Sequence, residues 1–162
     1  MTDTNATERE LTEAEKRENV IRLAFDGDPA KLDTFIQLIK KYLPENTGVV
    51  LRGSAVTGFR WKDKAPFDAD GPGTSDLDLT LVGHRVLEYY KVTGFFVPGV
   101  HSRPLSDEDP DIAPDLVPLR EQLMAMVKRP VNIQGTRDVV MYLRGELIGQ
   151  PYLTLVEKTD VD

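Results

Sequence analysis

The sequence contains no cysteine and only two histidines, His84 and His101, among its 162 residues. The absence of cysteine excludes disulfide bonds and thiolate metal sites. Any metal site in this chain must therefore be built mainly from oxygen ligands. Such ligands favour hard cations such as Mg²⁺ or Mn²⁺.

Long apolar runs are also missing. No stretch approaches the roughly 20 consecutive apolar residues that a membrane-spanning helix needs. Residues 1–19 are polar and acidic, without the apolar core of a signal peptide. These absences predict no membrane association and, by default, a cytoplasmic location. We expect residues 1–19 to form a polar N-terminal helix or frayed segment, followed by a single domain over residues 20–162.

Basic residues are outnumbered by acidic ones, 20 against 27, which gives a formal net charge of −7. Proteins that bind an extended nucleic-acid backbone usually present a basic face, because their affinity comes from neutralising phosphates. The charge balance therefore argues against extended DNA or RNA binding.

Hydrophobic periodicity predicts helices and strands that alternate along most of the chain. Asp28 and Pro29 form a helix start, and apolar residues at helical spacing extend that helix to residue 43. Five prolines between Pro98 and Pro118 predict a long irregular loop. The other predicted elements are strands at 49–51, 76–82, 95–97, 131–133 and 152–156, and helices at 86–92, 116–127 and 137–148. This order predicts a mixed β-sheet with flanking helices in an α/β or α+β domain.

Two aspartates lie two residues apart on one of these strands. The segment from Asp76 to Val82 reads DLDLTLV, so Asp76, Asp78 and Thr80 share one face of the strand. At a rise of about 3.3 Å per residue, the Cβ atoms of the two aspartates lie roughly 6–7 Å apart. Their carboxylates can therefore share a divalent cation, or hold two cations.

The predicted strand at 49–51 leads directly into Gly53 and Ser54. Glycine allows a phosphate to approach the backbone closely, and a helix starting after Ser54 would present free amides to it. A glycine-serine turn or an aspartate pair is a weak signal when it stands alone. Here the aspartates interrupt an apolar strand, where two unpaired carboxylates would be costly. The combination favours a phosphate-binding turn that faces a metal-binding acid pair.

These residues resemble the signature of the DNA polymerase β nucleotidyltransferase superfamily. The matching pieces are Leu51-Arg52-Gly53-Ser54, then Gly58, then Ser75-Asp76-Leu77-Asp78-Leu79, as in the minimal nucleotidyltransferases. The resemblance implies a mixed-sheet palm and Mg²⁺ (or Mn²⁺) held by Asp76 and Asp78 as catalytic residues. It also implies that Gly53, Ser54 and Ser75 bind a nucleoside triphosphate. Its nucleoside monophosphate would pass to an unknown acceptor: a protein side chain, an RNA end or a small molecule.

The chain departs from the family pattern in the spacing between its two motifs. The 21 residues between Ser54 and Asp76 exceed the usual gap. We expect this insert to form a flap beside the site, where Arg60, Lys62 and Lys64 would meet phosphates. A solvated surface loop is the alternative interpretation for these bases.

A second departure concerns the third acid that the superfamily places on a later strand. The best match is Val131-Asn132-Ile133, so Asn132 is predicted as a metal ligand through its amide oxygen, although it cannot act as a base. Asp111, Asp115 and Glu157 are other candidates for a third acid. The substitution leaves open a catalytically degenerate nucleotide- or protein-binding domain. A further alternative is an interaction domain whose acidic segments attract a basic partner.

The remaining polar residues carry weaker signals. In the locally basic region 116–149, the simplest interpretation of Arg129, Arg137 and Arg144 is a solvated helix face. A contact with the acceptor or the triphosphate is the alternative. His84 and His101 are expected at the surface or in local hydrogen bonds.

Overall fold

Alternating apolar residues build a six-stranded sheet in the computed structural model, which describes residues 10–60, 62–142, 144 and 149–158. The strand order is β3-β4-β5-β2-β1-β6. The strands are β1 (Gly48–Arg52), β2 (Leu77–Val82), β3 (Phe95–Val97), β4 (His101–Ser102), β5 (Val131–Thr136) and β6 (Tyr152–Val156). The central pair β2–β5 is parallel and the other pairs are antiparallel. The predicted mixed sheet of an α+β fold is confirmed.

The helices largely begin where the sequence signals place them. The α-helices are α2 (Glu13–Ala24), α3 (Pro29–Tyr42), α4 (Ser54–Thr57), α5 (His84–Leu87), α6 (Val117–Val127) and α7 (Asp138–Tyr142), with 3-10 turns η1 (Val92–Gly94) and η2 (Pro114–Leu116). Asp28 caps α3 by accepting a hydrogen bond from the backbone amide of Ala30, and Pro29 is its first residue, as predicted. No helix in the described ranges is long and apolar enough to cross a lipid bilayer.

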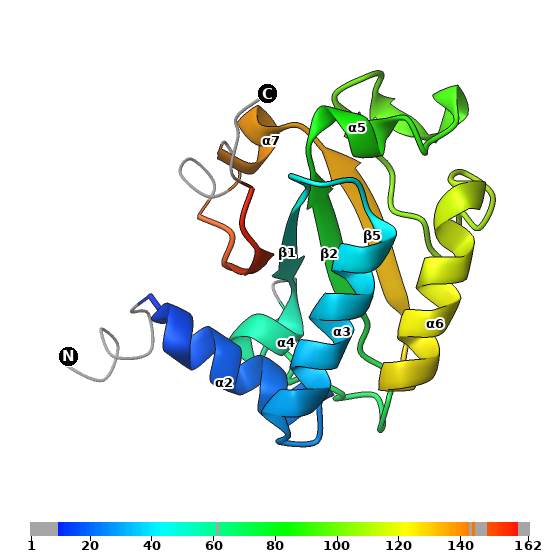
Figure 1. The fold of residues 1–162 in the computed structure, drawn as a ribbon. Coiled ribbons are helices and arrows are strands. Elements are labelled where there is room, and N and C mark those ends of the chain that lie inside the picture. The colour runs from blue at the N-terminus through cyan, green and yellow to red at the C-terminus, as the bar shows by residue number, and fades with distance from the viewer. Residues whose placement is uncertain (1–9, 61, 143, 145–148, 159–162) are drawn as a thin grey trace.

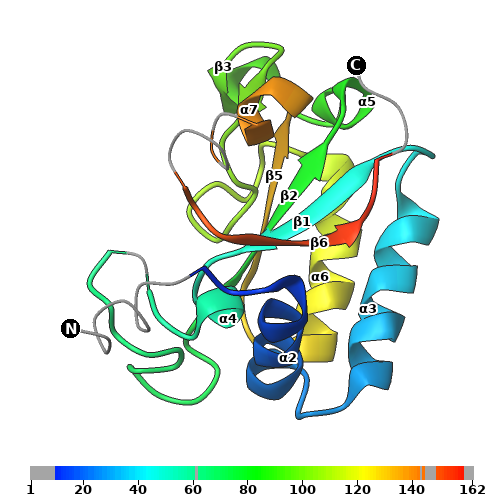
Figure 2. The same ribbon diagram turned by 90° about the vertical axis from the view of Figure 1, so that its left-hand side faces the viewer.

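Helices cover one face of the sheet. The other, called here the open face, is covered only in part, where Met141 of α7 packs with Val50 and Val82. Helices α2, α3 and α6 lie together on one side of the sheet in both views (Figures 1 and 2). Leu77, Leu79 and Leu81 of β2 are almost completely buried in the main hydrophobic core. Asp78 and Thr80 alternate with them on the opposite face, which confirms the predicted period of two. The open face therefore carries the polar side chains of the central strands.

Residues 98–118 form more structure than the sequence predicted. His101 and Ser102 make strand β4, which pairs with β5, and Leu105 bridges Ile133. Leu105 and Leu116 are fully buried. The prediction of a wholly irregular loop was wrong because prolines break local patterns but do not prevent pairing with a distant strand.

Two predicted segments fall partly outside the described residues. The polar segment expected over 1–19 is helical from Glu13, where Thr12 and Glu15 form a reciprocal capping box. Residues 1–9 lie outside the description. Similarly, the helix predicted over 137–148 is described as α7 from Asp138 to Tyr142, while residues 143 and 145–148 lie outside it.

Candidate active site

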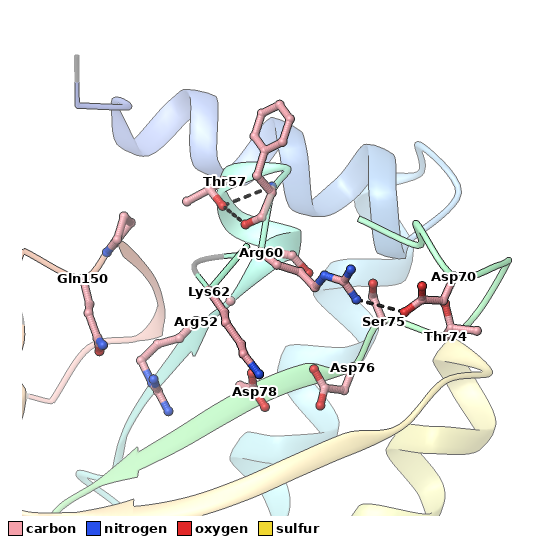
Figure 3. A pocket seen from close by; sticks show the side chains of 14 residues that line it. Arg52, Thr57, Arg60, Lys62, Asp70, Thr74, Ser75, Asp76, Asp78 and Gln150 are labelled. Carbon is pink, nitrogen blue, oxygen red and sulfur yellow. Dashed lines mark hydrogen bonds and ion pairs between the residues drawn. The ribbon is translucent and has the colours of Figure 1, made fainter. Parts of the chain in front are cut away.

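A pocket of about 450 Å³ lies where β1 ends and β2 begins. The turn after β1, the flap between the two strands and the start of β2 all contribute to its walls (Figure 3). Six residues predicted for the site line it: Gly53, Ser54, Arg60, Ser75, Asp76 and Asp78. The sheet therefore brings together two motifs that are separated by 21 residues of sequence.

Asp76 and Asp78 both face this pocket (Figure 3). Burial raises the pKa of Asp78 above its ordinary value, and the nearby charge of Asp76 raises it further. A hydrogen bond from Asn132 and the charge of Arg52, its register partner on β1, act in the opposite direction. A bound cation would relieve both the burial cost at Asp78 and its repulsion by Asp76.

Asn132 lies directly opposite Asp78 in the parallel pairing of β2 and β5. Its Nδ2 donates to Oδ2 of Asp76 at 2.8 Å and to Oδ1 of Asp78 at 3.1 Å. The residue predicted as a third metal ligand is therefore in contact with both acids. In this arrangement it serves them as a hydrogen-bond donor and presents its nitrogen, not its oxygen, to them.

A third acid does not join this pair. Among the described residues, no group of three or more histidine, aspartate or glutamate side chains is arranged to hold a metal ion. The backbone carbonyl of Asp115 accepts a hydrogen bond from Tyr42 of α3, on the covered side of the sheet. Glu157 follows Val156, which pairs with Val49 at the opposite end of β1 from the pocket.

Gly53 lies in the turn beside Asp78 and has a positive φ angle. Its φ of +97° lies in a region that other residues rarely adopt. A Cβ atom at this position would lie 3.1 Å from Oδ2 of Asp78. Glycine therefore leaves open the space next to this carboxylate, which agrees with the sequence argument for close approach of a ligand. Ser54 then begins the four-residue helix α4.

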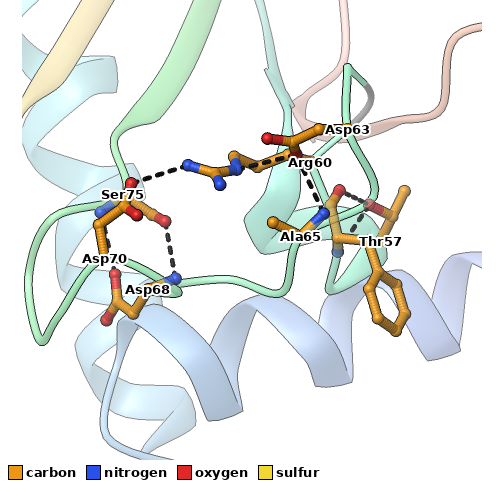
Figure 4. A network of polar contacts seen from close by, with 8 residues as sticks. Thr57, Arg60, Asp63, Ala65, Asp68, Asp70 and Ser75 are labelled. Atoms are coloured by element: carbon orange, nitrogen blue, oxygen red, sulfur yellow. Dashed lines mark hydrogen bonds and ion pairs between the residues drawn. The ribbon is translucent and has the colours of Figure 1, made fainter.

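The flap holds Arg60 at the edge of the pocket by ion pairs within the insert (Figure 4). Its Nη1 contacts Oδ2 of Asp70 at 2.9 Å, and its Nε contacts Oδ1 of Asp63 at 3.1 Å. Arg60 thus lines the pocket, as expected, but its guanidinium is shared by two carboxylates of the same segment. A phosphate would have to compete with Asp70 for it.

Ser75 anchors the end of the flap. Its backbone amide donates to Oδ1 of Asp68 at 3.0 Å, and its Oγ accepts from the amide of Asp68 at 2.7 Å. Arg129 donates to both Asp68 and the carbonyl of Ser75, and these contacts hold the pKa of Asp68 at about 2. The side chain of Arg129 is only 9% exposed, so the interpretation of it as a solvated residue was wrong.

A second polar cluster, which the sequence did not reveal, extends along the open face from Arg52. Arg52 donates from Nε to Oγ1 of Thr80 at 3.1 Å and from Nη2 to Oε1 of Gln134 at 3.3 Å. Arg144 donates from Nη1 to the same Oε1 at 3.4 Å and from Nη2 to Nε2 of His101 at 2.9 Å. Arg144 is half-buried, which corrects its interpretation as part of a solvated face.

His101 and Gln134 complete this cluster from neighbouring strands. Burial lowers the pKa of His101 to about 4, and the charges of Arg144 and Arg52 act in the same direction. The neutral ring accepts from Arg144 at Nε2, so its proton resides on Nδ1, 3.0 Å from Oγ1 of Thr136. His101 is therefore locally hydrogen-bonded, as predicted.

Gln150 lines the pocket on the side that approaches β6 (Figure 3). Its Oε1 is buried and has no hydrogen-bond partner within the described part of the chain. A buried acceptor without a partner costs about 1–3 kcal/mol, so a ligand that brings a donor to this atom would gain stabilisation. Gln150 was not predicted as a site residue, because a single glutamine beside a helix carries no recognisable motif.

No protein-family model, curated protein or solved structure shows a significant match to this chain. The function of this chain is therefore inferred from its site residues and their geometry.

Proposed function

We propose that this chain is a metal-dependent nucleotidyltransferase, similar to the polymerase β superfamily, which transfers a nucleoside monophosphate from a nucleoside triphosphate to an acceptor. The observation that carries the proposal is that Asp76 and Asp78 face the same pocket as Gly53 and Ser54. The pocket thus combines negative charge for a cation with a turn that a polyphosphate can approach.

The donors fit a hard divalent cation. Mg²⁺ is commonly bound through only one or two carboxylates, with substrate phosphates and water completing its ligands. Asp76 and Asp78 supply two carboxylates that line one pocket. Asp76 and Asp78 would hold Mg²⁺ or Mn²⁺. Such a cation supplies charge neutralisation for the triphosphate during transfer.

The other residues act on the nucleotide. Gly53 leaves the space beside Asp78 open to the phosphates. Ser54 can donate its hydroxyl to a phosphate oxygen at the start of α4, and Arg60 and Lys62 approach the pocket from the flap. The free acceptor atom Oε1 of Gln150 is suited to a hydroxyl or amino group of the nucleoside. Ser75 contributes by fixing the strand end next to Asp76.

The test is release of labelled pyrophosphate from γ-labelled nucleoside triphosphates with Mg²⁺ or Mn²⁺. We expect Asp76→Ala and Asp78→Ala to lower release at least a hundredfold, since they remove the carboxylates that hold the cation. Asp33→Ala is the matched control, because Asp33 pairs with Arg17 on the surface of α3. Equal release by the wild type and both site variants would exclude the proposed mechanism.

A second function is favoured by the position of Asn132. An amide between the two acids cannot accept a proton from an acceptor hydroxyl. A domain that binds a triphosphate without chemistry would show this feature. Calorimetry with Mg²⁺ and a triphosphate separates the two functions, because a binding domain would show heat of association without pyrophosphate release.

The proposal includes the cellular setting expected from the sequence. A cytoplasmic location would supply both Mg²⁺ and nucleoside triphosphates. The partners would be a triphosphate and one acceptor, without extended contact to DNA, as the net charge of −7 suggests.

A further inference from the structure

The cluster beside the acid pair contains two guanidinium groups that converge on one neutral atom. Arg52 and Arg144 both donate to Oε1 of Gln134, at 3.3 Å and 3.4 Å. Within the described residues, neither guanidinium forms a salt bridge with a carboxylate, whereas Arg17, Arg60, Arg103, Arg120 and Arg129 each do.

Placing two such cations together is unfavourable. Arg52 and Arg144 are both half-buried, and burial together with the charge of Arg52 lowers the pKa of Arg144 to about 10. Buried charges are normally paired. His101 adds a neutral ring and Thr80 a hydroxyl. Asp78 offsets part of the charge of Arg52, whereas the only described charge that acts on Arg144 is the positive charge of Arg52. An anion bound between the guanidiniums would remove this cost.

The cluster also adjoins the proposed active site. Arg52 lines the pocket and pairs in register with Asp78, and in Figure 3 Asp78 lies between Arg52 and Asp76. Thr80, which Arg52 contacts, is two residues beyond Asp78 on β2, or about 7 Å at 3.3 Å per residue. The segment carrying Arg144 reaches the pocket as well, because the amide of Gln150 donates to the carbonyl of Arg144.

We propose that Arg52 and Arg144 bind an anionic oxygen group of the acceptor, either a phosphate monoester or a carboxylate, next to the acid pair. This inference rests on the proposed nucleotidyltransferase function. It also explains why Asn132 can stand where the superfamily resemblance implies an acid, because an acceptor that is already ionised needs no carboxylate base. A hydroxyl acceptor would need one.

The reaction balances without proton transfer. One anionic oxygen of the acceptor forms a bond to the α-phosphorus of the triphosphate. The bond from that phosphorus to the bridging oxygen breaks, and its electron pair leaves with pyrophosphate. The product is a mixed anhydride between the acceptor and the nucleoside monophosphate.

The first experiment needs no nucleotide. Phenyl phosphate, benzoate and the neutral benzyl alcohol are titrated separately into the full chain while the ring signals of the two histidines are followed by NMR. We expect one or both anions to shift the signals of His101, which contacts Arg144, and not those of His84. Benzyl alcohol should shift neither. If neither anion moves the His101 signals, the inference is overturned.

Variants then locate the binding. Arg144→Gln should weaken binding of the effective anion at least tenfold. Arg103→Gln should leave it unchanged, since Arg103 is similarly half-buried but pairs with Asp109. Wild-type affinity in Arg144→Gln would contradict the inference. If a variant does not fold, the shifts of the His101 signals in the wild type still test whether the anion binds.

Pyrophosphate release separates this inference from the proposed function. With Mg²⁺ and a triphosphate, the effective anion should stimulate release at least tenfold more than benzyl alcohol. Stimulation by the alcohol alone would overturn the anionic acceptor while leaving nucleotidyl transfer in place. Anion binding that depends on Arg144, without any release, would refute the enzymatic function and the transfer step but retain the anion site.

Discussion

The side chain of Asn132 donates from Nδ2 to Oδ1 of Asp78 at 3.1 Å, across the parallel pair β2–β5. The same nitrogen donates to Asp76 at 2.8 Å. A neutral amide thus holds two acids together where the superfamily resemblance implies a third acid. Because an amide cannot accept a proton, this position supplies no general base.

Replacing Asn132 with aspartate should make the protein depend on metal for stability. Asn132→Asp removes the donor shared by the two acids and adds a third negative charge, so we expect a loss of about 1–3 kcal/mol in EDTA at pH 7. Mg²⁺ or Mn²⁺ should restore the melting temperature and raise it more than in the wild type. Asn132→Leu is the control, since it loses the donor without adding charge. No greater metal response in Asn132→Asp than in the wild type would contradict this prediction.

Removing the charge of Asp78 should stabilise the metal-free protein while abolishing function. The pKa of Asp78 is raised above 3.8, so its ionisation opposes folding at pH 7 and the cost disappears once the group is protonated at low pH. We expect Asp78→Asn to melt a few degrees higher than the wild type at pH 7 in EDTA. The difference should vanish as the pH falls below the unfolded-state pKa. A variant that melts lower at pH 7 would show that the carboxylate is stabilising there.

The opposite pH dependence is expected for Asp68. Its folded-state pKa of about 2 lies below 3.8 because Arg129 and backbone amides stabilise the carboxylate. Asp68→Asn should cost about 2 kcal/mol at pH 7, which lowers the melting temperature by roughly 4–8 °C in a chain of this size. The stabilisation is complete above pH 3.8, so the difference from the wild type should shrink as the pH falls toward 2. A constant difference down to pH 2 would refute the ionic origin of the effect.

Much of the fold was predictable because its signals are local. The alternation in DLDLTLV sets the two faces of β2, and Asp28-Pro29 marks the start of α3. Gly53 and Ser54 were identified because a strand leads directly into them. Each of these features depends on residues that are close in sequence.

The missed features depend on strand order, which a single sequence does not specify. Arg52 reaches Gln134 only because β2 lies between β1 and β5. His101 joins them through β4, which lies within a proline-rich segment that locally looks irregular. Arg129 was assigned to a solvated face because its partner Asp68 is 61 residues earlier in the chain.

The proposed contact between Arg60 and phosphate predicts competition with Asp70. Asp70→Asn should tighten binding of the Mg²⁺–triphosphate complex by no more than about fivefold, because an exposed ion pair is a weak competitor for the guanidinium. Arg60→Gln should weaken binding. The double variant should bind the complex with the same affinity as Arg60→Gln, because without Arg60 there is no guanidinium for which Asp70 and the phosphate compete. Tighter binding by Asp70→Asn even without Arg60 would point to a general charge effect.

The central claim is that Asp76 and Asp78 hold a cation together with a triphosphate. The most direct measurement is calorimetric titration of a non-hydrolysable ATP analogue into the wild type and into Asp76→Asn/Asp78→Asn, with Mg²⁺ and with EDTA. We predict Mg²⁺-dependent binding to the wild type, with a Kd in the range of roughly 1 µM to 1 mM that is usual for enzyme substrates, and none to the double variant. Equal binding by both proteins, or no binding by the wild type to analogues of any of the four nucleotides, would contradict the claim.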